Sequence, residues 1–548
     1  MTRQDIFYKK ADQLFYRILE LNPTSATQMG DHRFDGRLGD FTPGGLDGQN
    51  REMKSALADF ESMDTGAFTL DASVDHTLVV QILKSFIRQY ERIGSHRRDP
   101  GGYLGEMMSG VFLLIMKDFA PIEERLASAL QRMCEAPRVL AEGQINIRAA
   151  DVPPVWAEIA VEQVKQVPGL FMGLLPGIAA QAAPKMEADF KKAGGVVAEA
   201  AKRYEEFLTS KVLPAARGDF AVGRQVFDEM LHENHMVDYD ADGLIETGWR
   251  LFRETEKALA AAAREIDPAK SVQEILEDVK ADHPTVEGLL KAYQDAMQAT
   301  RQFVMDHDIA TIPAGESLRI METPAYARPI LPYAAYMPPG ILEKKQDGLF
   351  WVTPVEPGTP LDVAEQKLKG HNFAKLPITA LHEGYPGHHL QLVWSNRQKT
   401  IPRRMGAFLS TLFVEGWAFY CEELMEELGY IGTPVQRLGR LSDQLWRAAR
   451  IIIDSSLHTR GMKVQEAVDF LVEKCRLEPA NALAEVRRYT GSPTQPQSYL
   501  MGKLAIMEIV KQYRAANPGL TMKQMHDGIL GCGSLPPKLM RRVLGVSD

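Results

Sequence analysis

Apolar residues recur at three- and four-residue steps along most of this chain. Segments 5–21, 74–93 and 118–150 show this spacing clearly, and it is typical of an α-helix with one buried face. The same pattern predicts further helices at 194–214, 241–266, 285–306, 406–428, 436–458, 463–477 and 499–515. The chain is therefore expected to be mainly α-helical.

Strand signals are confined to one part of the sequence. Residues 316–340 and 348–355 are rich in β-branched and aromatic residues, and prolines and glycines bound them, as is typical of short strands. They predict a small sheet between two helical blocks. At 548 residues the chain exceeds the roughly 250–300 residues that one core supports, so we expect an N-terminal helical lobe over 1–310 and a second lobe over 311–548.

Composition narrows the class of protein. Hydrophobic residues make up 45% and charged residues 25% of the chain, which is typical of globular proteins. A net charge of −9 gives no basic surface for nucleic acid or for an anionic membrane, so a small or neutral partner is expected. The four cysteines are far apart and predict neither a disulfide framework nor a cysteine zinc site. With no signal peptide or membrane span recognisable in the sequence, a cytoplasmic location is expected.

The stretch TALHEGYPGHHLQ, residues 379–391, contains three histidines and a glutamate. In a helical H-E-x-x-H motif both histidines lie on one face and bind zinc, while the glutamate polarises a water molecule. Here the fifth position is Pro386, and the next histidines after His382 and Glu383 are His388 and His389. The standard motif is therefore absent, although its residue types are present.

Two positions compete for the second histidine ligand. On an unbroken helix, at about 100° per residue, His389 would lie near the azimuth of His382. Pro386 and Gly387 favour a break in the helix instead, and a bulged turn would bring His388 to that place. The alternative to a metal site is a capped helix whose histidines are satisfied by protein partners.

A third metal ligand is expected from residues 410–429, a second amphipathic helix. Its apolar stretch is interrupted by Glu415, and a carboxylate in such surroundings is costly unless it is paired or metal-bound. Glu422 lies seven residues further on and is expected to accept a hydrogen bond from a ligand histidine. The alternative for Glu422 and Glu423 is a solvated helix face.

Four stretches together, HEGYPGHHLQ, VEGWAFYCEEL, IIIDSSLHTRGM and EVRRYTGSPTQPQSYLMGKLAI, resemble the bacterial DUF885 family, which is placed among gluzincin-like metallopeptidases. The resemblance extends over nearly the whole chain. It implies a mainly α, two-lobed fold similar to the M32 carboxypeptidases, with a deep cleft, a small β-sheet near the active site, and lobes intertwined as one catalytic domain. It also implies that His388 is the second ligand.

The resemblance further places Arg488, Tyr489, Gln495 and Tyr499 in or near the cleft, the first three as residues that bind substrate. Tyr499 is the expected donor to the oxyanion, because a phenol can stabilise it without competing for the metal. This sequence reads PTQPQSY where the family usually has PGQALSY, so the added Pro496 leaves the place of Gln495 open.

Two other groups of residues are weighed for the site. Asp454 and His458 are four residues apart and so share a helical face, as an orienting carboxylate and a second oxyanion donor would; a structural pair is the alternative. In the proline-broken strand, Tyr336 and Arg328 are expected to bind substrate, with Arg328 as an anchor for a carboxylate. Tyr326 and Tyr333 accompany them there, and the alternative for this segment is core and turn.

These observations predict a zinc-dependent hydrolase that cleaves amide bonds in short peptides, of carboxypeptidase or oligopeptidase type. One Zn²⁺ per chain is expected on His382, His388 and Glu415, with Glu383 as general base. Hydrolysis of an amide or ester in a modified metabolite and non-catalytic peptide binding are the alternatives. No nucleic acid or membrane partner is expected, and a monomer and a homodimer both stay open.

Overall fold

The computed structural model describes residues 2–323, 328 and 334–547, and its fold is mainly α-helical with one small sheet, as predicted. By their contacts the residues form two compact units: Met1–Thr69, Val79–Phe220 and Gly340–Glu343 in the first, and Leu70–Leu78, Ala221–Pro339 and Lys344–Asp548 in the second. Residues 221–310, which were predicted to belong to the N-terminal lobe, thus group with the second unit. Periodicity identifies a helix's buried face but not the partner on which that face packs.

Among its described residues, the first unit contains helices and connecting turns but no strand. A capping box at its start, in which Thr2 and Asp5 exchange hydrogen bonds, begins the first helix, as such boxes commonly do. The helices are α1 (Arg3–Leu21), α2 (Pro23–Met29), α3 (Pro43–Glu61), most of α4 (Leu70–Arg88), α5 (Ser95–Arg98), α6 (Pro100–Met116), α7 (Ile122–Asn146), α8 (Pro154–Val164), α9 (Leu175–Ala182), α10 (Glu187–Phe207) and α11 (Leu213–Ala215). The apolar faces of α1, α3 and α4 meet in one core cluster, Phe7, Ala11, Ile18, Met53, Phe60, Val79, Val80 and Leu83.

The second unit contains the remaining helices and the sheet. The prediction for 241–266 agrees with α13 at both ends, whereas the predicted helix 406–428 is interrupted at Ser410. The helices are α12 (Gly223–Met230), α13 (Ala241–Ile266), α14 (Val272–Lys280), α15 (Leu289–Asp306), α16 (Leu361–Lys369), α17 (Leu376–Glu383), α18 (His388–Asn396), α19 (Ile401–Arg404), α20 (Gly406–Leu409), α21 (Leu412–Glu427), α22 (Pro434–Thr459), α23 (Val464–Cys475), α24 (Pro479–Thr490), α25 (Ser498–Ala516), α26 (Met522–Leu530) and α27 (Pro537–Leu544).

Short turns of tighter or wider helix connect several of these elements in both units. Those of the 3₁₀ type are His32–Phe34, Ala149–Asp151 and Pro184–Met186, and those of the π type are Gln89–Ile93, Gly169–Leu174, Leu208–Val212 and Leu231–His235.

Two closely packed helix pairs form the body of the second unit, α13 with α22 and α21 with α25. In the second pair, glycines allow the two backbones to touch. A Cβ on Gly416 would lie 2.3 Å from the carbonyl carbon of Gly502, and a Cβ on Gly502 would lie 2.1 Å from the carbonyl oxygen of Leu412. Only glycine fits such a crossing. It brings the first turn of α21 next to the first turn of α25.

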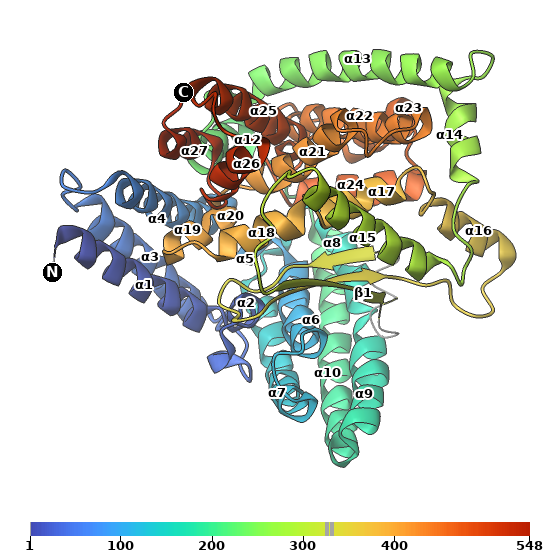
Figure 1. The fold of residues 1–548 in the computed structure, drawn as a ribbon. Helices are drawn as coiled ribbons and strands as arrows, with labels where there is room; N and C mark the ends of the chain where they lie inside the picture. The colour runs from blue at the N-terminus through green and yellow to red at the C-terminus, as the bar shows by residue number, and fades with distance from the viewer. Residues whose placement is uncertain (1, 324–327, 329–333, 548) are drawn as a thin grey trace. The chain divides into compact units, whose positions relative to one another are not determined.

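The sheet has three strands in the order β1-β3-β2. The central strand β3 (Gln346–Val352) pairs in parallel with β1 (Glu316–Glu322) and antiparallel with β2 (Ala334–Met337). Its run Leu349–Val352 is buried throughout, as expected for a strand that is covered on both faces. Figure 1 shows the sheet in yellow beside α15, and α15 contacts both β1 and β3.

Across the described part of the chain, no helix combines the length and the apolar character that a membrane-spanning segment requires.

Candidate metal centre

The motif 379–391 is divided between two helices. Helix α17 ends at Glu383, and α18 begins at His388. Pro386 has no N–H to continue the helix, and the chain turns back so that the N–H of Gly387 donates to the carbonyl of Leu381 at 3.0 Å. A Cβ on Gly387 would lie 2.0 Å from the carbonyl oxygen of His382. The Pro-Gly pair thus produces the break that the sequence favoured over an unbroken helix.

Helix α21 holds this turn in place. The indole N–H of Trp417 donates to the carbonyl of Pro386 at 2.8 Å, and the thiol of Cys421 lies 3.7 Å from the same oxygen. Both residues are buried. Because α21 also carries Glu415, one helix fixes the turn and supplies a carboxylate beside it.

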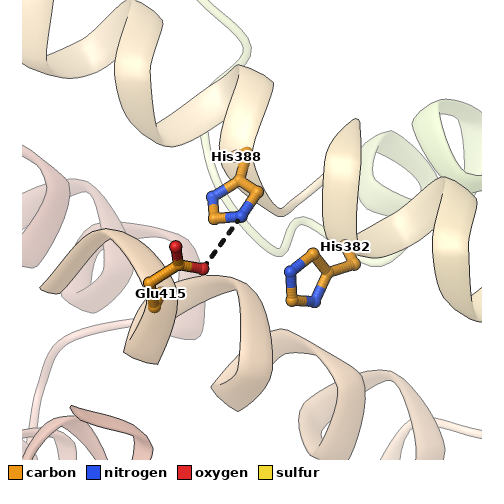
Figure 2. Close-up of side chains that lie close together, drawn as sticks. All are labelled: His382, His388 and Glu415. Carbon is orange, nitrogen blue, oxygen red and sulfur yellow. Dashed lines mark ion pairs between the residues drawn. The ribbon is translucent and has the colours of Figure 1, made fainter. Parts of the chain in front are cut away.

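The break brings His382, His388 and Glu415 together. Each of the three side chains offers one ligand atom, and these atoms lie within 4.8 Å of one another. Figure 2 shows the two imidazoles and the carboxylate converging from three elements, with His388 Nε2 at 3.5 Å from Glu415 Oε2. That spacing matches the ~3.4 Å that separates two ligands of a tetrahedral zinc ion at its usual bond lengths. We call these three residues the ligand cluster.

Two further residues orient the ligand cluster. The carboxylate of Glu422, only 2% exposed, lies 2.7 Å from Nδ1 of His382, which leaves Nε2 of that ring for the cluster. The amide N–H of Gln495 donates to Oε1 of Glu415 at 3.3 Å. Glu422 therefore occupies the supporting place expected of it and not a solvated face. Gln495, which was predicted to bind substrate, contacts a cluster residue instead.

The cluster attracts positive charge. Burial acts to lower the pKa of His388, but Glu415 and Glu383 more than offset this, and the pKa is raised above its ordinary value. Burial acts to raise the pKa of Glu415, yet His388 and His382 hold it below its usual range. The carboxylates that favour a protonated imidazole here would equally favour a bound cation.

The ligand cluster opens on a cavity of about 320 Å³. Glu383 and Tyr499, the predicted base and oxyanion donor, both line it, and their two roles stay predictions. Burial raises the pKa of Tyr499, so its phenol stays protonated near neutral pH and can donate a hydrogen bond. The lining residues are Ile378, Thr379, His382, Glu383, His388, Glu415, Glu422, Asp443, Arg447, Arg450 and Tyr499.

The sequence of this protein matches the profile of a family described as "Bacterial protein of unknown function (DUF885)" over residues 23–544. The chain belongs to the DUF885 family. The resemblance inferred from the motifs is thereby confirmed at the level of the family, and the metallopeptidase assignment stays a prediction.

Two solved structures resemble this DUF885 protein over nearly their whole length. One is described as "a putative lipoprotein of unknown function" from Shewanella oneidensis; it is 24% identical with a TM-score of 0.80, and 98% of this chain and 99% of that chain are covered. The other is a "putative lipoprotein" from Colwellia psychrerythraea. It is 16% identical with a TM-score of 0.85, and 100% of this chain and 99% of that chain are covered. These likenesses show the fold alone. No curated protein matches the sequence significantly.

Three residues of α22 line the cavity of this DUF885 protein although the sequence analysis did not single them out. They are Asp443, Arg447 and Arg450. They share a helical face with Asp454 and His458, since all five follow three- or four-residue steps. Charged residues at that spacing within the apolar stretch of α22 were the signal that could have identified them.

His458 does not reach the cavity. It is 1% exposed, and its Nε2 lies 3.0 Å from the carbonyl of Tyr489. It follows Arg450 by eight residues, or ~12 Å along the helix. Its neighbour Asp454 accepts from the N–H of Thr494 at 3.0 Å. This pair supports the loop before α25, and the structure does not bring His458 to the cavity, where the predicted oxyanion role would require it.

The other predicted substrate-binding residues have partners outside the cavity. Tyr489 is buried, and its hydroxyl accepts from Arg450 Nε at 2.9 Å. Arg488 donates to Gln495 and to Glu485 at 2.8 and 2.9 Å. These two residues therefore position neighbours of the site and do not line it.

Arg328 and Tyr336 were predicted to contact substrate from the strand segment. The guanidinium of Arg328 donates to the carbonyl of Thr323 and to two carboxylates, those of Glu322 and Glu356, at 2.8–3.0 Å. This leaves it poorly placed to anchor a substrate carboxylate. The hydroxyl of Tyr336 lies 3.0 Å from Nδ1 of His389, and neither residue lines the cavity. Tyr326 and Tyr333 lie outside the described residues.

Proposed function

We propose that this protein is a zinc-dependent hydrolase that cleaves amide bonds in short peptides. The observation that supports the proposal is the convergence of His382, His388 and Glu415, with Glu383 lining the same cavity. Catalytic zinc sites in general have three protein ligands and one open position. The ligand cluster supplies the three ligands, and the adjoining cavity leaves room for a water molecule or substrate at the open position.

The residues fit a zinc ion chemically. Two imidazole nitrogens and one carboxylate oxygen are a common set of zinc donors. His382 is held by Glu422 through its other ring nitrogen, which is the usual arrangement for a metal-binding histidine. When bound, zinc would act as a Lewis acid and lower the pKa of a water molecule to ~7.

The side chains around the cluster would carry the proton transfers. Glu383 takes a proton from the attacking water and passes it to the leaving amine, as general bases of this class do. Tyr499 donates its phenolic hydrogen to the oxygen that gains charge as the carbonyl is attacked. Water adds across the C–N bond, so the products are one carboxylate and one amine.

The test combines metal analysis with a peptide library. Purified protein should contain about one zinc per chain, and Glu383→Gln should keep the zinc while losing hydrolysis by about 1,000-fold, because the general base is removed and the ligands are not. Glu427→Gln, an exposed change on α21 outside the cavity, is the matched control. Full activity in Glu383→Gln would overturn the role of Glu383 as the base. If the screen also contains acylated small molecules and only these are cleaved, the substrate is a modified metabolite and not a peptide.

We further propose that the protein works in a reducing, cytoplasmic environment. Its four cysteines are free thiols, and Cys421, Cys475 and Cys532 are buried. Such thiols are typical of proteins from reducing compartments. Fractionation of cells that express the protein tests this proposal, and recovery in an extracytoplasmic fraction would contradict it.

A further inference from the structure

The lining of the cavity carries charges of both signs. Its acids are Glu383, Glu415, Glu422 and Asp443, and its bases besides the histidines are Arg447 and Arg450 of α22. The acids suit a cation. The two arginines have no role in binding a metal ion, and so they require a separate explanation.

Among the described residues, Arg447 and Arg450 each share their carboxylate partner with another cation. Asp443 is shared by Lys375 at 2.7 Å and Arg447 at 3.5 Å. The same holds one turn further along α22, where Glu485 is shared by Arg450 at 3.1 Å and Arg488 at 2.9 Å. Each of the two cavity arginines thus shares its carboxylate with a second, partly exposed cation, Lys375 or Arg488. A buried arginine whose charge is only partly balanced favours an anionic ligand.

Of the two arginines, Arg447 has the greater unused capacity to donate. Arg450 is committed, since its guanidinium donates to Tyr489 and to Glu485. Arg447 donates one long hydrogen bond, 3.4 Å to the carbonyl of Asp443, and its buried Nε has no hydrogen-bond partner. A buried donor left unpaired is costly, and the anionic group of a ligand would satisfy it.

Aromatic rings hold the Arg447 guanidinium in place. Its Cζ lies 4.8 Å from the ring centroid of Trp446, 5.6 Å from that of Phe419 and 5.8 Å from that of Tyr499. Contacts with ring faces fix the group while leaving N–H edges available. The planar fork of arginine matches a carboxylate through two parallel hydrogen bonds.

We infer that Arg447 binds the C-terminal carboxylate of the peptide substrate, which makes the protein a carboxypeptidase. This inference rests on the proposed peptide hydrolysis and specifies its substrate. A cavity of about 320 Å³ is at the small end of the ~300–1,000 Å³ range of ligand pockets and suits a chain end. Every peptide carries a carboxylate at that end, at a set distance from its last amide bond. Hydrolysis therefore releases a C-terminal residue or short fragment.

The binding test uses the Glu383→Gln protein with zinc, and titrates it calorimetrically with Ala-Ala-Ala, its C-terminal amide, and Ala-Ala-Glu amide. The free acid should bind about 10- to 100-fold more tightly than either amide, as expected for one charge-assisted pair. Adding Arg447→Met should remove this preference, because the fork is lost while Asp443 keeps Lys375 as its partner. Arg437→Met, a change at an exposed arginine of the same helix, should retain the preference.

Equal binding of acid and amide, or a preference that survives Arg447→Met, would overturn the inference. Tight binding of Ala-Ala-Glu amide would overturn the assignment to the chain terminus. Arg447→Lys, which keeps the charge and loses the fork, guards against misfolding: it should fold as wild type does and bind the acid with intermediate affinity.

Hydrolysis separates this inference from the proposed function. With Glu383 intact, Arg447→Met should raise KM for free-acid peptides about 10- to 100-fold with little change in kcat. Acid-selective binding without any hydrolysis by wild type would contradict the proposed function and support the anchor. Equal hydrolysis of acids and amides would overturn the anchor while the proposed function stands.

Discussion

Two neighbouring histidines, His388 and His389, lie in opposite environments although each pairs with a glutamate. His389 lies against the sheet, with Nε2 at 2.8 Å from Glu316 and Nδ1 at 3.0 Å from the hydroxyl of Tyr336. Both of its ring nitrogens are satisfied by the protein. In the ligand cluster, by contrast, Nδ1 of His388 has no hydrogen-bond partner, and Nε2 faces Glu415 beside the Nε2 edge of His382. Both sites contain a histidine-carboxylate pair. What distinguishes the candidate metal site from the structural one is a histidine ring nitrogen that has no hydrogen-bond partner in the protein.

The largest effect is expected for His388→Ala. Loss of one of three zinc ligands should remove the metal from purified protein and reduce peptide hydrolysis by at least ~1,000-fold. The free energy of unfolding of the metal-free protein should change by less than about 1.5 kcal/mol, because His388 makes few satisfied hydrogen bonds with the protein. Metal analysis and urea denaturation check the two parts. Retention of one zinc per chain would exclude His388 as a ligand.

His389→Ala should have the opposite effect, with stability lost and zinc binding retained. The change removes the shared partner of Glu316 and Tyr336, although Glu316 keeps Tyr385 and Arg301. With the cavity left by the buried ring, it should lower the free energy of unfolding by about 2–4 kcal/mol. The folded fraction should still bind zinc. Tyr336→Phe, which removes a single hydroxyl, is the matched control and should cost ~1 kcal/mol. Loss of zinc from His389→Ala at unchanged stability would show that the two histidines have been assigned the wrong way round.

Glu422→Gln should weaken the metal site without removing a ligand. The carboxylate that orients His382 would become a neutral amide, and such losses reduce metal affinity by about 10- to 100-fold. Competition with a chromogenic chelator measures the change, with Glu427→Gln of the same helix as the control. Equal zinc affinity in the two variants would mean that the contact between Glu422 and His382 only supports the fold.

The smallest effect is expected for Gln495→Ala. Its hydrogen bond to the Glu415 carboxylate is long, at 3.3 Å, so although the acceptor is charged we expect it to contribute only about 0.5–1 kcal/mol. Zinc affinity in the same competition assay should fall by about threefold. A loss as large as that of Glu422→Gln would indicate that Gln495 contacts the metal site more directly than the structure describes.

Periodicity predicted the helices well because it reports directly on which face is buried. The agreement over 241–266 shows this, and the prolines and glycines of 316–355 equally identified the sheet. Ideal helix geometry favoured His389 and the expected break favoured His388, and the sequence alone could not decide between them, since the outcome depends on how Trp417 holds the carbonyl of Pro386. That contact joins residues 31 positions apart.

The other differences between the predicted and the observed site also arise from tertiary packing. Arg447 and Arg450 looked like ordinary helix charges until the packing of α22 buried them at the cavity. His458 looked like a donor, but the same helix carries it past the site. The contact between Gly416 and Gly502, which brings Glu415 and Tyr499 to one place, involves two residues with no chemical signature in the sequence.

The central claim is that a divalent metal binds between His382, His388 and Glu415. Anomalous diffraction at the zinc absorption edge, from crystals of protein purified with zinc, tests it most directly. We expect one strong anomalous peak within bonding distance of all three side chains. Absence of a peak there, or a peak beside His389 and Glu316, would contradict the account.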